Sequence, residues 1–199
     1  MQAKSQKQIK DELQYIISGI GRKEPESLIE TATSYLRAGK ATNKQTETTE
    51  FPKQEEAKAL EPFAHQNSLW VNKPANVYYL AEGAEQKVYL KQDGNAVLKF
   101  NDAIFYVCWE DYFISLTPHN YFFPETAYTL IGFHKEDDRL FAVVQQAFVI
   151  VQAATNLTTI KQFLLNNGFT HKKNNDYFNE CLGIILENLH DENVLTNTG

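Results

Sequence analysis

Small and charged residues occupy a short segment in the middle of the chain that could bind phosphate. Gly83 and Ala84 lie between two apolar runs, and side chains this small let backbone N–H groups approach phosphate oxygens. Glu82 and Glu85 flank them, and their carboxylates would repel phosphate. Two interpretations stay open: a loop that covers the phosphates of a nucleotide, or an ordinary β-turn.

Lys99 ends the apolar run Val97-Leu98-Lys99, sixteen residues after Gly83. A lysine with apolar neighbours on a central strand is costly unless an acid pairs with it. Glu110 is our candidate partner, and Asp111 is the alternative. The competing interpretation is a lysine whose ammonium group reaches solvent at the end of the strand.

The segment from Asn188 to Leu195 resembles the catalytic loop of kinase-type phosphotransferases. Such loops place an Asp five positions before an Asn: the Asp takes the proton of the substrate hydroxyl, and the Asn holds a metal ion. Asn193 fits this pattern, but Asn188 stands at the Asp position, and an amide cannot act as a base. His190-Asp191-Glu192 are adjacent and not spaced to converge on one ion, so we reject a metal site there.

Two further pairs of polar residues lie near predicted strands. Gln145-Gln146 follow an apolar run, at the place where kinases have the hinge whose backbone binds adenine. His119-Asn120 lie between Pro118 and Pro124, and we interpret them as part of a turn with no catalytic role.

The elements that must position these residues follow from hydrophobic periodicity. The turn 92–95, which contains Asp93-Gly94, predicts a hairpin, and the charged turn 135–138 separates the last two strands. We predict helices over 7–21 (stopped at Gly21), from about Pro25 to about Gly39, over 104–116 (ended by Pro118) and over 158–166, and strands over 77–80, 87–90, 96–100, 127–133 and 140–144. Most of the remaining carboxyl-terminal part is expected to be helical or irregular.

Composition divides the chain into three parts. Residues 1–39 are predicted to form a helical hairpin, and residues 40–59 a polar linker, because 42–50 contain almost no apolar residue. Residues 60–199 are the expected kinase-like domain. The order strand, strand, strand, helix, strand, strand is that of a kinase amino-terminal lobe, although many α+β domains share it.

Bulk properties exclude several classes of protein. The chain has 199 residues, is 43% hydrophobic and carries a formal net charge of −6, which argues against a nucleic-acid binder. It has no apolar run long enough to span a bilayer and no signal-peptide core, so we expect a cytoplasmic protein without a membrane partner. Cys108 and Cys181 stand far apart in apolar segments, and we expect buried free thiols rather than a disulfide.

From about Leu69 to its end, the chain resembles the kinase-like domain of polyvalent proteins from phages and conjugative elements, a branch of the protein-kinase-like and aminoglycoside-phosphotransferase-like fold. The resemblance implies ATP and Mg²⁺ as cofactors, Lys99 as phosphate anchor with Glu110 as its partner, and Asn193 as metal ligand. It rests on the segments 82–89, 97–99, 119–124, 128–133, 143–146, 168–169 and 189–195.

We therefore expect an α+β fold: a five-stranded antiparallel sheet with its helix, a few following helices that form a partial carboxyl lobe, and an amino-terminal helical hairpin. The function expected is that of a degenerate kinase-like module of a mobile genetic element with weak or no phosphotransfer. The alternatives are an interaction module that binds no nucleotide, and an active kinase in which Asp191 or a substrate group replaces the base. The second metal-binding acid and most of the carboxyl lobe do not appear in the sequence, so we expect either a longer natural protein or a truncated gene. A carboxyl-lobe segment or a second copy of the chain is then expected to cover the apolar surface.

Overall fold

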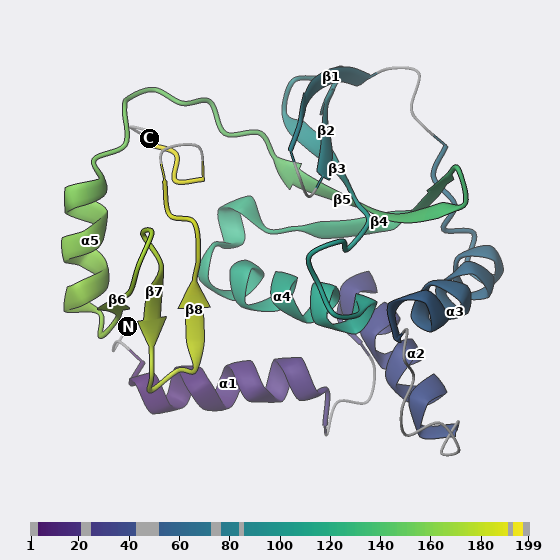
Figure 1. The fold of residues 1–199 in the computed structure, drawn as a ribbon, viewed down its shortest axis with the longest axis horizontal. Coiled ribbons are helices and arrows are strands. Elements are labelled where there is room, and N and C mark those ends of the chain that lie inside the picture. Colours follow the sequence, from purple (N-terminus) through teal and green to yellow (C-terminus); the bar gives the residue numbers. More distant parts are fainter. Residues whose placement is uncertain are drawn as a thin grey trace. The chain divides into compact units, whose positions relative to one another are not determined.

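The structure, a computed structural model, describes residues 4–20, 25–42, 52–72, 77–83, 86–190 and 193–196. It is an α+β protein with five helices, a five-stranded sheet and a small three-stranded sheet in the described ranges (Figure 1). The predicted fold class is confirmed. Contacts group the chain into two compact units, a central unit of Ile17–Phe148 and a terminal unit of Met1–Ile16 with Val149–Gly199, which differ from the three parts that composition suggested.

The five-stranded antiparallel sheet of the central unit has the order β1-β2-β3-β5-β4 (Figure 1). Hairpin formation at 92–95 is confirmed: the Gly94 amide donates to Lys91 O, and Asp93 Oδ1 accepts from the Asn95 amide. All five strands were predicted, and the structure extends each of them by one to three residues at its carboxyl-terminal end. They are β1 (Val77–Glu82), β2 (Gln86–Lys91), β3 (Ala96–Asn101), β4 (Thr129–Glu136) and β5 (Arg139–Ala147).

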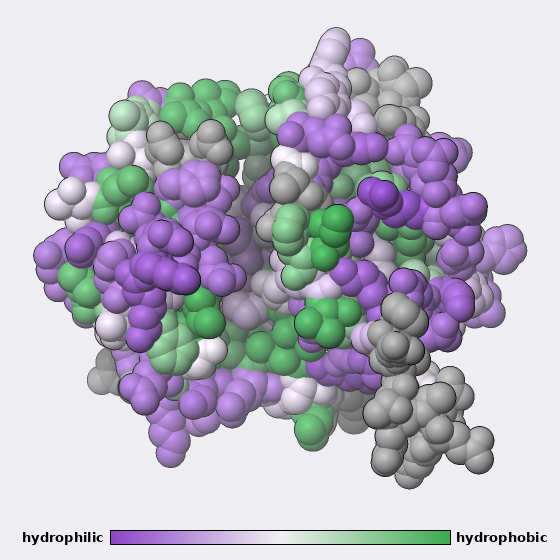
Figure 2. Space-filling model, in the orientation of Figure 1, coloured by the Kyte–Doolittle hydropathy of each residue, from purple (hydrophilic) through white to green (hydrophobic). Residues whose placement is uncertain are grey.

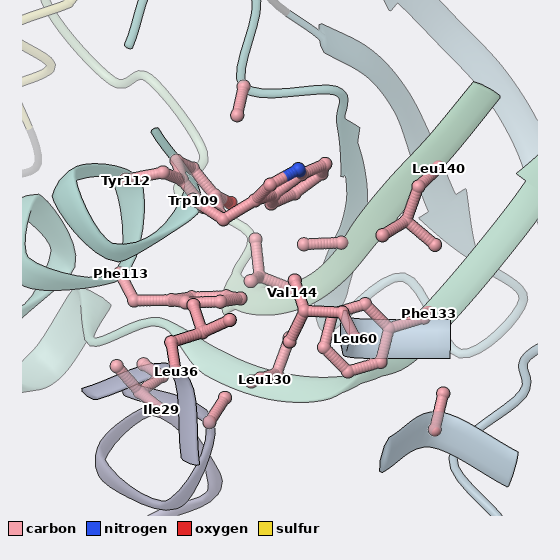
Figure 3. Packing of buried hydrophobic residues seen from close by; sticks show 14 of the residues in the cluster. Ile29, Leu36, Leu60, Trp109, Tyr112, Phe113, Leu130, Phe133, Leu140 and Val144 are labelled. Atoms are coloured by element: carbon pink, nitrogen blue, oxygen red, sulfur yellow. The ribbon is translucent and has the colours of Figure 1, made fainter. Parts of the chain in front are cut away.

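Helix α4 (Trp109–Phe122) packs on one face of this sheet. The prediction of a helix over 104–116 was wrong at both ends, because residues 102–108 form a loop and Pro118 lies inside the helix. Figure 3 shows Trp109 and Phe113 of α4 lying beside Val144 and Leu130 of the sheet. Burying a phenylalanine side chain stabilises a fold by about 1.5–3 kcal/mol. Trp109 and Phe113 are both buried here, and this interface forms the main core.

Two further helices complete the same core from the amino-terminal side: α2 (Leu28–Thr42) and α3 (Pro52–Gln66). Ile29 and Leu36 of α2 and Leu60 of α3 are buried in the cluster around α4 (Figure 3). The predicted polar linker was wrong from residue 52 onward, where α3 begins. Its charged residues hid the helix, since only its last part carries an evident apolar face.

The opposite face of the sheet carries a second, smaller core. It contains Tyr89, Leu98, Phe100, Phe141 and Val143. The rings of Tyr89 and Phe100 meet edge to face, with their centroids 5.2 Å apart. Apolar side chains therefore pack against both faces of the central strands.

The segment after α3 pairs with β4 through a parallel bridge between Trp70 and Phe133, and this pairing explains why position 132 is a glycine. The amide of Phe133 donates to Leu69 O at 2.8 Å, and the amide of Val71 donates to Phe133 O at 2.7 Å. A Cβ at Gly132 would lie 2.1 Å from Leu69 O. Only glycine lets the two backbones approach this closely.

The terminal unit combines α1 (Gln6–Ser18), through its residues up to Ile16, with α5 (Leu157–Asn166) and a sheet ordered β6-β7-β8. Here β6 is Thr170–His171, β7 is Tyr177–Asn179 and β8 is Ile184–Leu186. Both helices were predicted. Gly21, the predicted stop of the first helix, lies outside the described residues. A few further helices were expected after α5, and the three short strands take their place.

The thiols and the surface complete the description. Cys108 is buried and Cys181 is exposed, and both are free, so the prediction was right about pairing and wrong about the burial of Cys181. Hydrophilic residues dominate the face that Figure 2 shows, with separate apolar groups among them. In the ranges that the structure describes, we find no helix with the length and apolar character needed to cross a bilayer.

Candidate functional site

Lys99 lies in the middle of β3, on the face of the sheet that packs against α4. Its register neighbours are Val88 on β2 and Val144 on β5, so apolar side chains flank it on both sides. Its Nζ lies 3.4 Å from the hydroxyl oxygen of Tyr128 and 5.1 Å from the centre of that ring. Burial lowers the pKa of Lys99 from 10.5 to about 8. Within the described ranges, no carboxylate forms an ion pair with this lysine.

The predicted ion pair between Lys99 and Glu110 is wrong. Glu110 Oε1 accepts from Arg37 Nε at 2.7 Å, and its Oε2 lies 2.6 Å from Lys40 Nζ. Because α4 begins at Trp109, Glu110 stands in its first turn rather than in its middle. Asp111, the alternative partner, stands in the same turn.

Glu110 belongs instead to a charge network that joins three helices. Lys40 Nζ also lies 2.6 Å from Oε1 of the buried Glu56 on α3, and Glu56 Oε2 accepts from the Glu110 amide at 3.0 Å. Burial raises the pKa of Glu110, but its hydrogen bonds to Lys40 and Arg37 outweigh this, so the pKa is lowered. Burial likewise lowers the pKa of Lys40, and its bonds to Glu110 and Glu56 more than offset that, so its pKa is raised. The network holds α2 and α3 on the first turn of α4.

The turn between β1 and β2 contains the predicted phosphate loop. The Gly83 amide donates to Gln86 O at 3.0 Å, and a Cβ at Gly83 would meet no atom within 4 Å. Packing therefore does not require a glycine at position 83. Ala84, and Glu85 beside it, lie outside the described residues.

Gln145 and Gln146 are strand residues, because β5 continues to Ala147. Gln145 pairs with Leu98 of β3 and with Thr129 of β4, and Gln146 pairs with Val97 of β3. The predicted hinge position after Val144 was therefore too early. Their side chains bind within the unit: Gln145 Oε1 accepts from Lys91 Nζ at 3.2 Å.

In the terminal unit, Asn188 and Asn193 are joined by a hydrogen bond. The side-chain nitrogen of Asn193 donates to Asn188 O at 2.9 Å, and the Asn193 amide donates to His190 O at 3.0 Å. Asn188 has φ +54°, a conformation that Asn and Asp adopt more readily than other non-glycine residues. Asp176 Oδ1 fixes this residue by accepting from its amide at 3.0 Å.

The loop leaves one oxygen for a cation. The Nδ2 atom of Asn193 is held by its hydrogen bond to Asn188 O. The Oδ1 atom of Asn193 has no hydrogen bond to the residues that the structure describes. An amide oxygen is a ligand that Mg²⁺ accepts. Asp191 and Glu192 lie outside those residues. No group of three His, Cys, Asp or Glu side chains in the described segments is arranged to hold a metal ion.

Sequence reasoning missed Tyr128, which contacts the ammonium group of Lys99, and the way in which His119 and Asn120 hold it. His119 and Asn120 are in the last turn of α4, not in a turn between elements. Asn120 binds both backbone groups of Tyr128, and His119 packs its ring on that of Tyr128. The available signal was a pair of side-chain hydrogen-bonding residues just before a tyrosine and an apolar strand.

Comparison with known proteins yields one match. A family described as "Serine/Threonine/Tyrosine Kinase found in polyvalent proteins" matches residues 53–199, which begin in α3. No curated protein and no solved structure matches the chain. The match covers most of the chain, including every strand described above. The chain therefore belongs to the family of kinases found in polyvalent proteins.

Proposed function

We propose that this kinase-like chain is a nucleotide-binding module with weak or no phosphotransfer activity, that is, a pseudokinase of a phage or conjugative element acting in the bacterial cytoplasm. Lys99 is proposed to bind the phosphates of ATP, together with Gly83 and Ala84. Asn193 is proposed to hold Mg²⁺.

The observation that supports this proposal best is the environment of Lys99. Burial among apolar neighbours keeps its pKa at about 8, and no carboxylate among the described residues neutralises it. Keeping a partly buried cation in this state is unfavourable for stability, which favours a role for it. A phosphate group would supply the missing negative charge and raise the pKa of the lysine again.

The side chain of Asn193 fits a magnesium ion. Asn193 offers Oδ1 because its nitrogen is held by Asn188 O. When bound, Mg²⁺ would neutralise charge on the phosphate oxygens. The amide oxygen of Asn193 and the phosphate oxygens are both oxygen ligands, which Mg²⁺ prefers.

Asn188 supports the low activity. Its exposed side chain makes no hydrogen bond with any residue that the structure describes, and its amide cannot remove a proton from a hydroxyl group. The backbone at this position suits Asp as well as Asn. Asn188→Asp therefore tests the chemistry without changing the loop.

Thermal denaturation with and without ATP and Mg²⁺ tests nucleotide binding. Ligand at a hundredfold excess over Kd stabilises the folded state by about 2.7 kcal/mol. We expect a rise in Tm in the unsubstituted chain and none in Lys99→Met, each measured against its own nucleotide-free melt. Lys91→Met, on the neighbouring strand, should keep the shift. No shift in the unsubstituted chain at millimolar ATP would contradict the proposal.

The second candidate is an interaction module that binds no nucleotide. The loop before α4 exposes three apolar side chains: Ile104 at 54%, Phe105 at 61% and Val107 at 74%. Such a group favours a protein partner or a second copy of the chain. Sedimentation over a wide concentration range distinguishes a second copy of the chain from a different protein partner, because a dimer dissociates on dilution. Phe105→Ser should weaken such a dimer.

A further inference from the structure

We infer that Tyr128 is the positioning residue for Lys99. Its neutral side chain holds the ammonium group in place, as a carboxylate partner would, but leaves the positive charge unpaired. The inference rests on the proposed function only in that Lys99 is taken to bind phosphate. It is drawn from four contacts within the central unit.

The first contact is between Tyr128 and the lysine. The ammonium nitrogen lies at the hydroxyl end of the ring, 3.4 Å from the hydroxyl oxygen and 5.1 Å from the ring centre, which is within the range of a cation–π interaction. Tyr128 is the one hydrogen-bonding and ring partner of Lys99 among the residues that the structure describes. A ring holds an ammonium group without neutralising it, so the positive charge stays available to an anion.

The second contact fixes the backbone of Tyr128. Asn120 Oδ1 accepts from the Tyr128 amide at 2.7 Å, and Asn120 Nδ2 donates to Tyr128 O at 2.8 Å. One side chain thus binds both backbone groups of one residue, as a neighbouring strand would. Tyr128 lies just before β4, where no strand pairs with it.

The third and fourth contacts hold the segment from Thr126 to Tyr128 from two sides. The rings of His119 and Tyr128 lie 4.6 Å apart, and His119 Nε2 lies 3.0 Å from Thr126 O. Gln146 of β5 donates to the same carbonyl oxygen at 2.8 Å. The ring of Tyr128 is therefore fixed by the end of α4 and by the sheet.

His119 is the other titratable group beside Lys99. Burial lowers the pKa of His119, the contact with Thr126 O raises it, and the positive charge of Lys99 lowers it further, so the net direction is down. The lowered pKa favours the neutral imidazole, so Lys99 is the residue beside the ring of Tyr128 that brings a positive charge.

NMR of lysine side chains tests the inference without any nucleotide. The Lys99 resonance is identified by its absence in Lys99→Arg, and its pH titration is followed in each variant. Tyr128→Leu should let the ammonium group reach solvent and shift its titration toward that of an exposed lysine. Tyr128→Phe, which keeps the ring, should shift it less. An unchanged Lys99 titration in Tyr128→Leu would overturn the inference.

Nucleotide affinity separates this inference from the proposed function. ATP binding should weaken at least tenfold in Tyr128→Leu and by no more than threefold in Tyr128→Phe. Tyr121→Leu is the matched control, since its ring packs on Phe122, 5.1 Å away, and it should leave both readouts unchanged. If the Lys99 titration shifts but no variant binds ATP, the positioning role holds and the nucleotide proposal fails.

Asn120 provides a second series should Tyr128→Leu fail to fold. Asn120→Ala removes both bonds to Tyr128, whereas Asn120→Asp keeps the acceptor for the Tyr128 amide. The Lys99 titration should move in Asn120→Ala and return part of the way in Asn120→Asp. Equal titrations in both variants and the unsubstituted chain would contradict the clamp.

Discussion

Replacing Lys99 by methionine should stabilise the central unit. Burial lowers the pKa of Lys99 from 10.5 to about 8, a difference of about 2.5 units. One unit corresponds to about 1.4 kcal/mol, so the charged form is disfavoured in the folded state by about 3 kcal/mol. Methionine has a similar length and no charge. Lys99→Met should therefore raise the free energy of unfolding at pH 7 by up to about 3 kcal/mol.

The gain depends on pH in a defined direction. Below pH 8 the lysine is charged in the folded and the unfolded state, and the unfavourable burial of its charge is complete. Between about 8 and 10.5 the folded state loses its proton before the unfolded state does, so the unsubstituted chain becomes relatively more stable as the pH rises. The advantage of Lys99→Met should shrink over this interval and disappear above it.

Urea denaturation followed by tryptophan fluorescence measures the effect. Trp70 and Trp109 are the two tryptophans of the chain, and both lie in the central unit, so the signal reports on that unit. Lys58→Met, which loses only an exposed pair with Glu55, is the control and should change the stability by about 0.5 kcal/mol or less. A loss of stability in Lys99→Met, or a gain that is the same at pH 7 and pH 10.5, would refute the reasoning.

Three other substitutions or reagents give further tests. Glu56→Ala removes the acceptor of the Glu110 amide and a partner of Lys40, and should destabilise the central unit by about 1–3 kcal/mol in urea; Glu55→Ala, which loses only an exposed pair with Lys58, should have almost no effect. Gly132→Ala places a methyl group against Leu69 O and should lower Tm sharply, whereas Gly39→Ala inside α2 should raise stability by about 0.5–1 kcal/mol; equal melts would contradict the close approach. A thiol reagent at pH 8 should modify Cys181 alone in the native protein, because burial raises the pKa of Cys108 to about 11; two modified thiols before unfolding would disagree with the structure.

Hydrophobic periodicity and turn residues predicted the sheet well. Each of its strands carries its own apolar pattern, and the Asp93-Gly94 turn depends only on neighbouring residues in the sequence. Helix α3 was missed because its stability depends on distant charges: Glu56, 6% exposed, is tolerated only beside Lys40 and the first turn of α4. Helix α4 extends past Pro118 because Asn120 and His119 hold its last turn to the segment before β4. These contacts of α3 and α4 cannot be read from the hydrophobic periodicity of the sequence.

The candidate site divides in the same way. The position of Lys99 among apolar residues was readable, since β3 is a short buried strand. Its partner was not, because a shift of a few residues in the start of α4 moves Glu110 from the middle of the helix to its first turn. Tyr128 acts through a ring and a clamped backbone, and no acidic residue marked the place.

The cap of α4 has a consequence for the order of folding. Cys108 at its N-cap position supplies no side-chain hydrogen bond. The Glu110 amide donates instead to Glu56, which lies 54 residues before Glu110 in the chain. A local cap forms as a helix nucleates, whereas this one requires a long loop to close first, which costs chain entropy. We expect the first turn of α4 to form late, once α3 has docked. The three strands that lie between the two helices in sequence must by then already be folded back.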